Sequence, residues 1–295
     1  MVNSFRTAWR DGAFFLGEFL QARQRRNSGL MGAMRRRASF AIRDSFVLSY
    51  PKCGRTWLRT MIGRVIDRRY GLDLENPMEL QHFWKAGRKV PCIGISHDDE
   101  PHLRHPHEMV ADKSRFRNKK VLFLARDPRD VTVSYYFDAL NRMKVINCSI
   151  QDFLYKGPGS IDSIIAYYNI WAKERDKVRD FKLVTYEDLR QRPDDVLRSA
   201  LTFLGVTDVS DDIIREAVEF ASFENLKKKE ASDAFSHIRL RPADPANPES
   251  FKVRRGKVGG YRDYFSKQEI EFMDRRIAKN LDPFFDSYVS AREAA

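Results

Sequence analysis

The feature that most constrains the fold of this chain is a short β-prone segment that leads through a glycine-containing loop into a helix. Residues 45–50 read Ser-Phe-Val-Leu-Ser-Tyr, residues 51–56 read Pro-Lys-Cys-Gly-Arg-Thr, and apolar residues recur at helical spacing from Trp57 to Ile66. A strand that feeds directly into a helix is the repeating unit of parallel α/β sheets. The segment therefore predicts an α/β domain with a ligand loop at the carboxyl end of a strand.

A second unit of the same kind follows later in the chain. Residues 121–125, Val-Leu-Phe-Leu-Ala, are followed closely by a helix start, in which Asp127 caps the helix and Pro128 takes its first position. A third strand is predicted at residues 181–186, after an amphipathic helix at 161–178. We predict a P-loop-like three-layer sandwich, with a central, mostly parallel sheet and helices on both faces.

The N-terminal segment differs in composition from the rest of the chain. Residues 1–44 hold nine arginines against three acidic residues, half of the chain's formal net charge of +12. We divide the sequence into a basic N-terminal arm or helix, 1–44, and an α/β domain, 45–295. Two interpretations of the arm stay open: a solvated segment packed on the domain, or a segment that contacts an anionic membrane surface. No basic stretch is interleaved with aromatics in a recognisable module, so we expect no nucleic-acid partner.

Cysteine usage and hydropathy bear on the compartment. The three cysteines are too few for a disulfide framework, which favours a reducing cytoplasm. No apolar stretch reaches the length that a membrane span needs. We predict a cytoplasmic protein, with peripheral membrane contact through the arm as the alternative, and the oligomeric state is left open.

The loop after the strand at 45–50 has the parts of a phosphate cradle. Lys52 brings a charge, Gly54 allows close backbone approach, and Thr56 brings a hydroxyl at the start of a helix. In the loop of nucleoside triphosphatases the lysine follows the last glycine, whereas here Lys52 precedes Gly54. The strand at 121–125 delivers Arg126, where such enzymes need an acidic group for Mg²⁺. The pattern predicts a metal-free site for a nucleotide with phosphates at two places.

Five segments, in order, resemble the cytosolic-type sulfotransferases, which use 3′-phosphoadenosine-5′-phosphosulfate (PAPS) as sulfuryl donor. Residues 50–58 are similar to that family's 5′-phosphosulfate loop, usually Y-P-K-S-G-T-T-W-L, and residues 126–136 to its 3′-phosphate motif. Residues 184–189 resemble the strand that supplies an adenine-contacting tyrosine, and residues 222–223 resemble a Ser-Phe pair near the base. Residues 254–262 are similar to the late segment that closes over the 3′-phosphate. The resemblance implies a PAPS-dependent sulfotransferase.

The resemblance also implies which residues contact the donor. They are Lys52, Cys53, Gly54, Arg55, Thr56 and Trp57 in the first loop, Arg126 and Ser134 in the second unit, and Tyr186, Ser222, Phe223, Arg254, Arg255 and Gly256 further on. Cys53 stands where the family usually has serine. Two interpretations of it stay open: a small residue that offers its backbone amide, or a thiol made oxidisable because Lys52 and the helix N-terminus lower its pKa.

Transfer of a sulfuryl group to a hydroxyl or amine needs a base for the acceptor's proton. The resemblance implies a histidine in this role, and a catalytic loop lysine, Lys52, that stabilises the departing phosphate. His97 is the best candidate among the six histidines, because residues 92–95 read as a short strand that delivers a Ser-His-Asp segment to its end.

The surroundings of His97 are predicted in part. We expect the carboxylates of residues 98–100 to hold the imidazole or raise its pKa. The family's lysine two residues before the histidine is replaced by Ile95, so one expected cation is missing or supplied from elsewhere. If His97 is not the base, the next candidates are His82, His102 and Glu79.

Two other classes of protein share part of this pattern. A P-loop-type nucleotide-dependent kinase would have the same strand-loop-helix unit and a basic site, and a non-catalytic protein that binds anionic lipid would use the arm. Five motifs in the family's order favour the sulfotransferase. Its acceptor is a small molecule, a lipid or a glycan, and the sequence does not choose among them. The polar segment 232–260 is too long for a simple connector and predicts a functional loop or lid.

Overall fold

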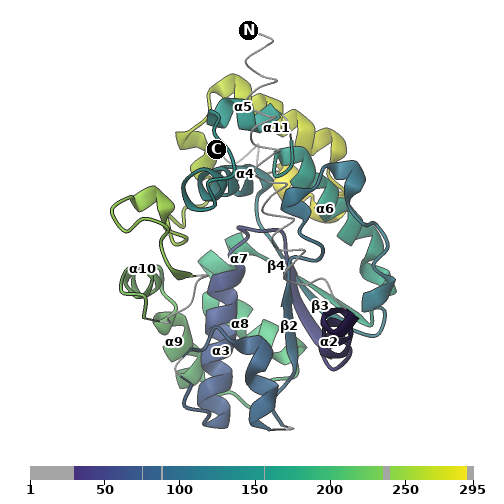
Figure 1. Cartoon of the computed structure of the whole chain (residues 1–295), viewed down its shortest axis with the longest axis vertical. Helices are drawn as coiled ribbons and strands as arrows, with labels where there is room; N and C mark the ends of the chain where they lie inside the picture. The colour runs from purple at the N-terminus through teal and green to yellow at the C-terminus, as the bar shows by residue number, and fades with distance from the viewer. Residues whose placement is uncertain (1–29, 75, 88, 156, 235–239, 291–295) are drawn as a thin grey trace.

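A parallel sheet lies at the centre of the molecule (Figure 1). The computed structural model describes residues 30–290 apart from 75, 88, 156 and 235–239. Within these residues the sheet has four strands in the order β2-β1-β3-β4, and all neighbours are parallel. The strands are β1 (Ser45–Ser49), β2 (Ile93–Ser96), β3 (Lys120–Ala125) and β4 (Asp180–Thr185). The predicted α/β class with a central parallel sheet is confirmed.

Strand order decides which face of the sheet each long helix covers. The crossover from β1 to β2 runs in one direction, and that from β3 to β4 runs in the opposite direction. Because such crossovers are right-handed, α3 (Arg55–Tyr70) and α6 (Ile161–Glu174) lie on opposite faces. α3 packs against α8 (Pro193–Phe203) and α9 (Asp211–Phe220), and α6 packs against α4 (Pro128–Phe137) and α11 (Lys267–Asn280). The loops after β1 and β3 therefore leave the sheet toward opposite faces, which is where open α/β sheets bind ligands.

The remaining helices are short. They are α2 (Leu30–Ala41), α5 (Ile150–Tyr155), α7 (Tyr186–Gln191), α10 (Phe223–Ala231) and α12 (Ser287–Ser290). Turns of 3₁₀ helix cover Leu80–Ala86, Pro101–Leu103, Pro106–Glu108, Ser114–Phe116, Arg175–Lys177, Pro248–Ser250, Gly260–Asp263 and Pro283–Phe285. A π-helical turn, Asp138–Arg142, continues α4.

The core is built around β3. Residues 121–125 are all 0% exposed, as expected for a strand that is covered on both faces. The ring centre of Phe123 lies 5.8 Å from that of Tyr167 on α6, 6.0 Å from that of Phe181 on β4 and 6.1 Å from that of Phe285. These contacts hold the sheet against α6 and the C-terminal segment, and so keep the carboxyl end of β3 in place.

The predicted element bounds agree with the structure to within a few residues. The strand predicted at 181–186 ends one residue earlier because Tyr186 already begins α7. The helix predicted at 161–178 is divided into α6 and a following 3₁₀ turn. The predicted helix cap is confirmed, since the Asp127 side chain accepts a hydrogen bond from the N–H of Arg129 and Pro128 begins α4.

Only part of the predicted basic arm falls within the described residues. Residues 1–29 lie outside them, and α2 makes up most of the remainder. The ring centre of Phe40 on α2 lies 4.7 Å from that of Phe46 on β1 and 5.2 Å from that of Phe116. This end of the arm is therefore packed on the domain. In the described part of the chain, no helix is both long enough and apolar enough to cross a membrane.

The packing of α3 against the segment after it generates a stability prediction. A Cβ atom built on Gly63 would lie 1.8 Å from the carbonyl oxygen of Pro77, and both residues are buried. We expect Gly63→Ala to lower the free energy of unfolding by about 1–3 kcal/mol because the methyl group overpacks the site. Urea unfolding monitored by circular dichroism measures this.

A matched control lies on the same helix. Arg69 is exposed, so Arg69→Ala should change the free energy of unfolding by no more than about 0.5 kcal/mol. Alanine ordinarily stabilises a helix by roughly 0.5–1 kcal/mol relative to glycine. A Gly63→Ala variant that is as stable as the parent would contradict the close approach of α3 to Pro77.

Candidate functional site

Strand register brings the predicted ligand segments to one edge of the sheet. Ser49 at the end of β1 pairs with Leu124 of β3, the last residues of β3 and β4 pair with each other, and the last residue of β2 pairs with Leu48. The segments that begin at residues 50, 97, 126 and 186 therefore leave the sheet from the same edge. Parallel pairing thus assembles one site from four separate parts of the sequence.

The first loop turns sharply into α3. Lys52 and Gly54 both have positive φ angles, 73° and 89°, and the N–H of Trp57 already donates to the carbonyl of Gly54 at 2.9 Å. A Cβ atom on Gly54 would lie 2.6 Å from the ring of Tyr186. Only glycine fits both the backbone angle and the space at this position. The first-turn amides of α3 are thereby aimed at the sheet edge, where they favour an anion.

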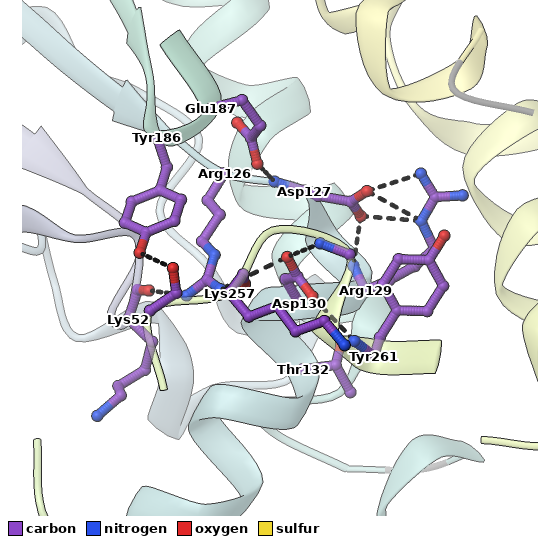
Figure 2. Close-up of polar contacts among 12 residues, drawn as sticks. Lys52, Arg126, Asp127, Arg129, Asp130, Thr132, Tyr186, Glu187, Lys257 and Tyr261 are labelled. Carbon is purple, nitrogen blue, oxygen red and sulfur yellow. Dashed lines mark hydrogen bonds and ion pairs between the residues drawn. The ribbon is translucent and has the colours of Figure 1, made fainter. Parts of the chain in front are cut away.

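Arg126 connects the first loop to the late segment of the chain (Figure 2). Its guanidinium donates to the carbonyl of Lys52 at 3.4 Å and to the carbonyl of Lys257 at 2.9 Å. The guanidinium carbon also lies 4.3 Å from the ring centre of Tyr186. Its own backbone N–H is held by the hydroxyl of Tyr168 at 2.9 Å. Arg126, which is predicted to contact the ligand, is therefore buried and forms a junction between three parts of the site.

The late segment is tied down by two buried carboxylates. Asp130 on α4 accepts from the N–H of Gly259 at 2.9 Å and from the N–H of Tyr261 at 3.0 Å, as Figure 2 shows. Glu230 on α10, which is 0% exposed, accepts from the amides of residues 252 and 253 at 2.6 and 2.8 Å. The part of the predicted loop from residue 252 onward is thus anchored beside Arg126. Its opening as a lid stays a prediction.

The residues predicted to meet the adenine come together. The ring centres of Trp57 and Tyr186 are 5.9 Å apart with a steep tilt between them. Gly256 has a positive φ of 62°, and a Cβ atom there would lie 2.8 Å from the ring of Phe223. The hydroxyl of Tyr186 donates to the carbonyl of Gly256 at 3.1 Å. Tyr186 thus lies between the ring of Trp57 and the backbone of Gly256, which the ring of Phe223 also approaches.

Two predicted donor contacts have their polar groups engaged within the protein. Ser222 caps α10, with its hydroxyl oxygen accepting from the N–H of Asn225 at 3.3 Å. Arg254 donates to Glu249 at 2.9 Å, and its guanidinium lies 4.1 Å from the ring centre of Phe137.

The other three predicted contacts are more accessible to solvent than the buried Arg126. Arg255 is exposed and pairs with Asp263 at 3.3 Å. Thr56 and Ser134 are half-buried in the first turn of α3 and on α4.

Lys52 has a partner that the sequence reasoning missed. Its ammonium group lies 2.7 Å from a carboxylate oxygen of Asp138, and both side chains are mostly buried. Burial by itself would raise the pKa of Asp138, but the charge and the hydrogen bond of Lys52 lower it below its ordinary value. The signal in the sequence is spacing, since Asp138 follows Ser134 by one helical turn and so returns to the same face.

Both ring nitrogens of His97 are hydrogen-bonded. Nδ1 lies 2.9 Å from the carbonyl oxygen of Ser49, and Nε2 lies 2.6 Å from a guanidinium nitrogen of Arg55. Because a carbonyl only accepts, Nδ1 carries the proton and Nε2 accepts from Arg55. Burial lowers the pKa of His97 well below its ordinary value, and the charges of Arg55 and His102 lower it further. The imidazole is neutral at pH 7 and faces the loop predicted to hold an anion.

The expectation that the carboxylates of residues 98–100 would hold this imidazole was wrong. Asp98 is ion-paired with Lys113 at 2.7 Å and with Arg115. Asp99 pairs with Arg104 at 3.3 Å. Residues 98, 99 and 100 all have positive φ angles, 51°, 72° and 54°, so the chain turns away directly after His97. The pKa of His97 is lowered, first by burial and then by neighbouring positive charge, instead of raised by carboxylates.

Positive charge near His97 comes from two residues far apart in the sequence. Arg55 contacts the ring directly, and Lys252 is close enough to lower the pKa of His97 by its charge. Burial lowers the pKa of Lys252 itself well below its ordinary value, with Lys52 and Arg142 acting in the same direction. Arg55 and Lys252 are therefore the candidates for the cation that is absent at Ile95. The basic composition of residues 252–257 was the available signal for Lys252.

Of the alternative bases, only His102 lies near His97. Its ring centre is 6.0 Å from that of His97, and its side chain is buried. His82 and Glu79 face each other at 3.5 Å and line a cavity of about 570 Å³ together with Asp73, which follows the far end of α3. Because α3 has 16 residues, that end is about 24 Å from the first loop.

Cys53 is a buried thiol. It is 0% exposed, and its sulfur lies 3.3 Å from the hydroxyl of Tyr168. Burial raises the pKa of Cys53 to about 12, which outweighs the nearby arginines. The interpretation of Cys53 as a thiol with a lowered pKa is therefore wrong, because the ammonium of Lys52 is directed at Asp138 and the sulfur is directed into the core.

Comparison with known proteins identifies related chains. The family model described as a sulfotransferase domain matches residues 42–285. Flavonol 3-sulfotransferase of Flaveria bidentis is 25% identical over 257 residues, which cover 81% of this chain and 81% of that protein. Sulfotransferase 1B1 of Mus musculus is 26% identical over 251 residues, which cover 81% of this chain and 82% of that protein.

A solved structure shares the fold. Mouse sulfotransferase SULT7A1 complexed with PAP superposes with a TM-score of 0.58 at 18% identity, covering 86% of this chain and 89% of that chain. At this identity the likeness concerns the arrangement of strands and helices.

The environment of Cys53 predicts its reactivity. Because its pKa is raised to about 12 by burial, we expect Cys53 to resist iodoacetamide at pH 8 in the folded protein and to react fully after unfolding in urea. Mass spectrometry of the tryptic peptides after timed alkylation measures the modified fraction. Rapid modification of Cys53 in the folded protein, at the rate seen in urea, would contradict the buried position of the sulfur.

Proposed function

The chain belongs to the sulfotransferase domain family, and we propose that it moves a sulfuryl group from PAPS to a hydroxyl or amine of a small-molecule, lipid or glycan acceptor. One observation carries the proposal: two cation-bearing segments, the Lys52 loop and the Arg126 junction, meet at the ends of neighbouring strands. A nucleotide that carries phosphate groups at both its 5′ and 3′ positions matches two such segments. The neighbouring rings of Trp57, Tyr186 and Phe223 suit its base.

The chain's own geometry supports the fit of this donor. Gly54 and Gly256 both have positive φ angles, and aromatic rings fill the space that a Cβ atom would need. Backbone amides at these positions can therefore approach a phosphate closely. In this proposal residues 52–57 bind the 5′-phosphosulfate, and Arg126, Ser134 and residues 254–256 bind the 3′-phosphate. Trp57, Tyr186, Ser222 and Phe223 then line the adenine site.

The proposed chemistry uses His97 as base and Lys52 as the cation at the leaving group. Nε2 of His97 accepts the proton of the acceptor hydroxyl while the acceptor oxygen forms a bond to sulfur. The bond between sulfur and the 5′-phosphate oxygen breaks, and the ammonium of Lys52 stabilises the charge on that oxygen. Most of the acceleration then comes from positioning and electrostatic stabilisation, since the protein forms no covalent bond.

The acceptor and the compartment are part of the same proposal. The name of the Flaveria relative specifies a flavonol, which makes phenolic hydroxyl compounds the first acceptors to test. The cysteines of the described residues, Cys53, Cys92 and Cys148, are unpaired, which suits a reducing cytoplasm. Peripheral membrane contact through residues 1–44 is the alternative location, and sedimentation with anionic liposomes with and without these residues tests it.

Labelled-sulfate transfer from PAPS across phenol, steroid, lipid and sugar acceptors tests the activity. We expect transfer to at least one acceptor class. We also expect Lys52→Gln and Arg126→Gln to bind the product nucleotide, 3′-phosphoadenosine-5′-phosphate (PAP), roughly tenfold or more weakly, because each substitution removes a charge-assisted contact. Arg215 is exposed on α9, so Arg215→Gln is the matched control. Activity with ATP that a chelator abolishes, with none from PAPS, would favour the kinase instead.

The assignment of the base gives a separate prediction. His97→Gln should lower turnover by about a hundred- to ten-thousand-fold while PAP affinity, measured by calorimetry, stays within a few-fold of the parent value. His107 is exposed, and His107→Gln should leave turnover unchanged. Near-normal turnover in His97→Gln, together with a large loss in His102→Gln, would move the base to His102.

A further inference from the structure

The nitrogen of His97 that would act as base is covered by a cation. Nδ1 is held by the carbonyl of Ser49, so Nε2 is the nitrogen with a lone pair, and Arg55 donates to it at 2.6 Å. A proton arriving at Nε2 has to displace this hydrogen bond. It would also create a second positive charge beside the guanidinium, which is why Arg55 lowers the pKa of His97.

Arg55 stands where the donor is proposed to bind. It is the first residue of α3 and follows Gly54 directly. In the sulfotransferase pattern Y-P-K-S-G-T-T-W-L this position is a threonine, whose side chain is too short to span from α3 to the ring of a residue after β2. Arginine at this position is therefore the feature of this chain that joins the first loop to His97.

A guanidinium exchanges a neutral partner readily for an anionic one. Hydrogen bonds between arginine and a phosphate or sulfate oxygen are charge-assisted and bidentate, roughly twice as strong as those to neutral acceptors. The imidazole of His97 is neutral, so a phosphosulfate in the first loop offers Arg55 the better partner. The other groups that face His97 are His102, the charge of Lys252 and the carbonyl of Ser49.

We infer that Arg55 is a positioning residue that covers Nε2 of His97 until the donor's phosphosulfate draws its guanidinium away. This inference rests on the proposed function. It makes donor binding a condition for uncovering the base, so the acceptor loses its proton only when the sulfuryl group is in place. By linkage, donor binding must then raise the affinity of His97 for a proton, and protonation of His97 must raise the affinity for the donor.

Imidazole nitrogen NMR of the full chain, labelled with ¹⁵N-histidine, tests this coupling with a readout other than turnover. A pH titration is recorded for the parent, Arg55→Met and Arg55→Lys, each with and without PAP. In the parent, PAP should increase the proton affinity of His97 tenfold or more, since a cation leaves and an anion arrives. In Arg55→Met the proton affinity of His97 should be higher than in the parent even without PAP, although burial still lowers it, and the effect of PAP should shrink several-fold.

Two variants serve as controls for Arg55→Met. Arg55→Lys retains the positive charge but lacks the planar guanidinium. The proton affinity of His97 in this variant should therefore lie between those in the parent and in Arg55→Met. Arg215→Met, at an exposed position of α9, should behave as the parent does.

The outcomes separate this inference from the proposed function. PAP binding with the same His97 titration in the parent and in Arg55→Met, with and without PAP, would overturn the role of Arg55 alone. Failure of PAP to bind the parent would overturn the donor proposal and the coupling together. An effect of PAP that disappears in Arg55→Met and returns in part in Arg55→Lys supports the coupling.

Discussion

The buried guanidinium of Arg126 is the interaction on which the rest of the site depends. It joins the carbonyl of Lys52 in the first loop to the carbonyl of Lys257 in the late segment and packs on the ring of Tyr186. An unpaired buried cation would be costly, and Asp130 lies 3.5 Å away to offset it. The same carboxylate fixes the backbone of the late segment. Arg126 and Asp130 thereby hold three distant parts of the chain next to one another.

Several positive charges lie close together in the site. His97 and Lys252 both have pKa values well below their ordinary ones, burial being the first cause and neighbouring cations the second. Asp138 is ion-paired with Lys52, whereas Arg55 donates a hydrogen bond to the neutral imidazole of His97. A ligand with several negative charges would offset these positive charges. The electrostatics of the site and the proposed donor are therefore complementary, and the same positive charges help to keep the imidazole neutral.

Much of the fold could be predicted because its signals are local. The runs at 46–48 and 121–125 are apolar without interruption, as expected for strands buried on both faces. Asp127 with Pro128 marks a helix start, because the aspartate side chain caps the helix and proline suits its first position. The meeting of Lys52, Arg126 and His97 follows from the same signals. Strand ends in a parallel sheet share an edge, so residues placed directly after strands are brought together whatever their distance in the sequence.

The interactions between particular side chains could not be predicted from such local signals. The carboxylates after His97 are adjacent in sequence, but positive φ angles turn them toward Lys113 and Arg104. Helical spacing placed Asp138 on the face of Ser134, and basic composition marked residues 252–257, but neither signal specified Lys52 as the partner of Asp138 or His97 as the neighbour of Lys252. The burial of Cys53 against Tyr168 likewise reverses the pKa direction that its neighbours in sequence suggest.

The sequence by itself determined the parallel α/β class, the loop at residues 51–56, the helix caps and the set of segments that reach the ligand edge. These features depend on spacing and backbone geometry, which are local properties. Only the tertiary structure decided which charges face each other, how deeply each titratable group is buried, and that Arg55 occupies the lone pair of His97. Electrostatic interactions depend on distances and burial in three dimensions, and those are set by the packing of helices and loops that the linear order does not contain.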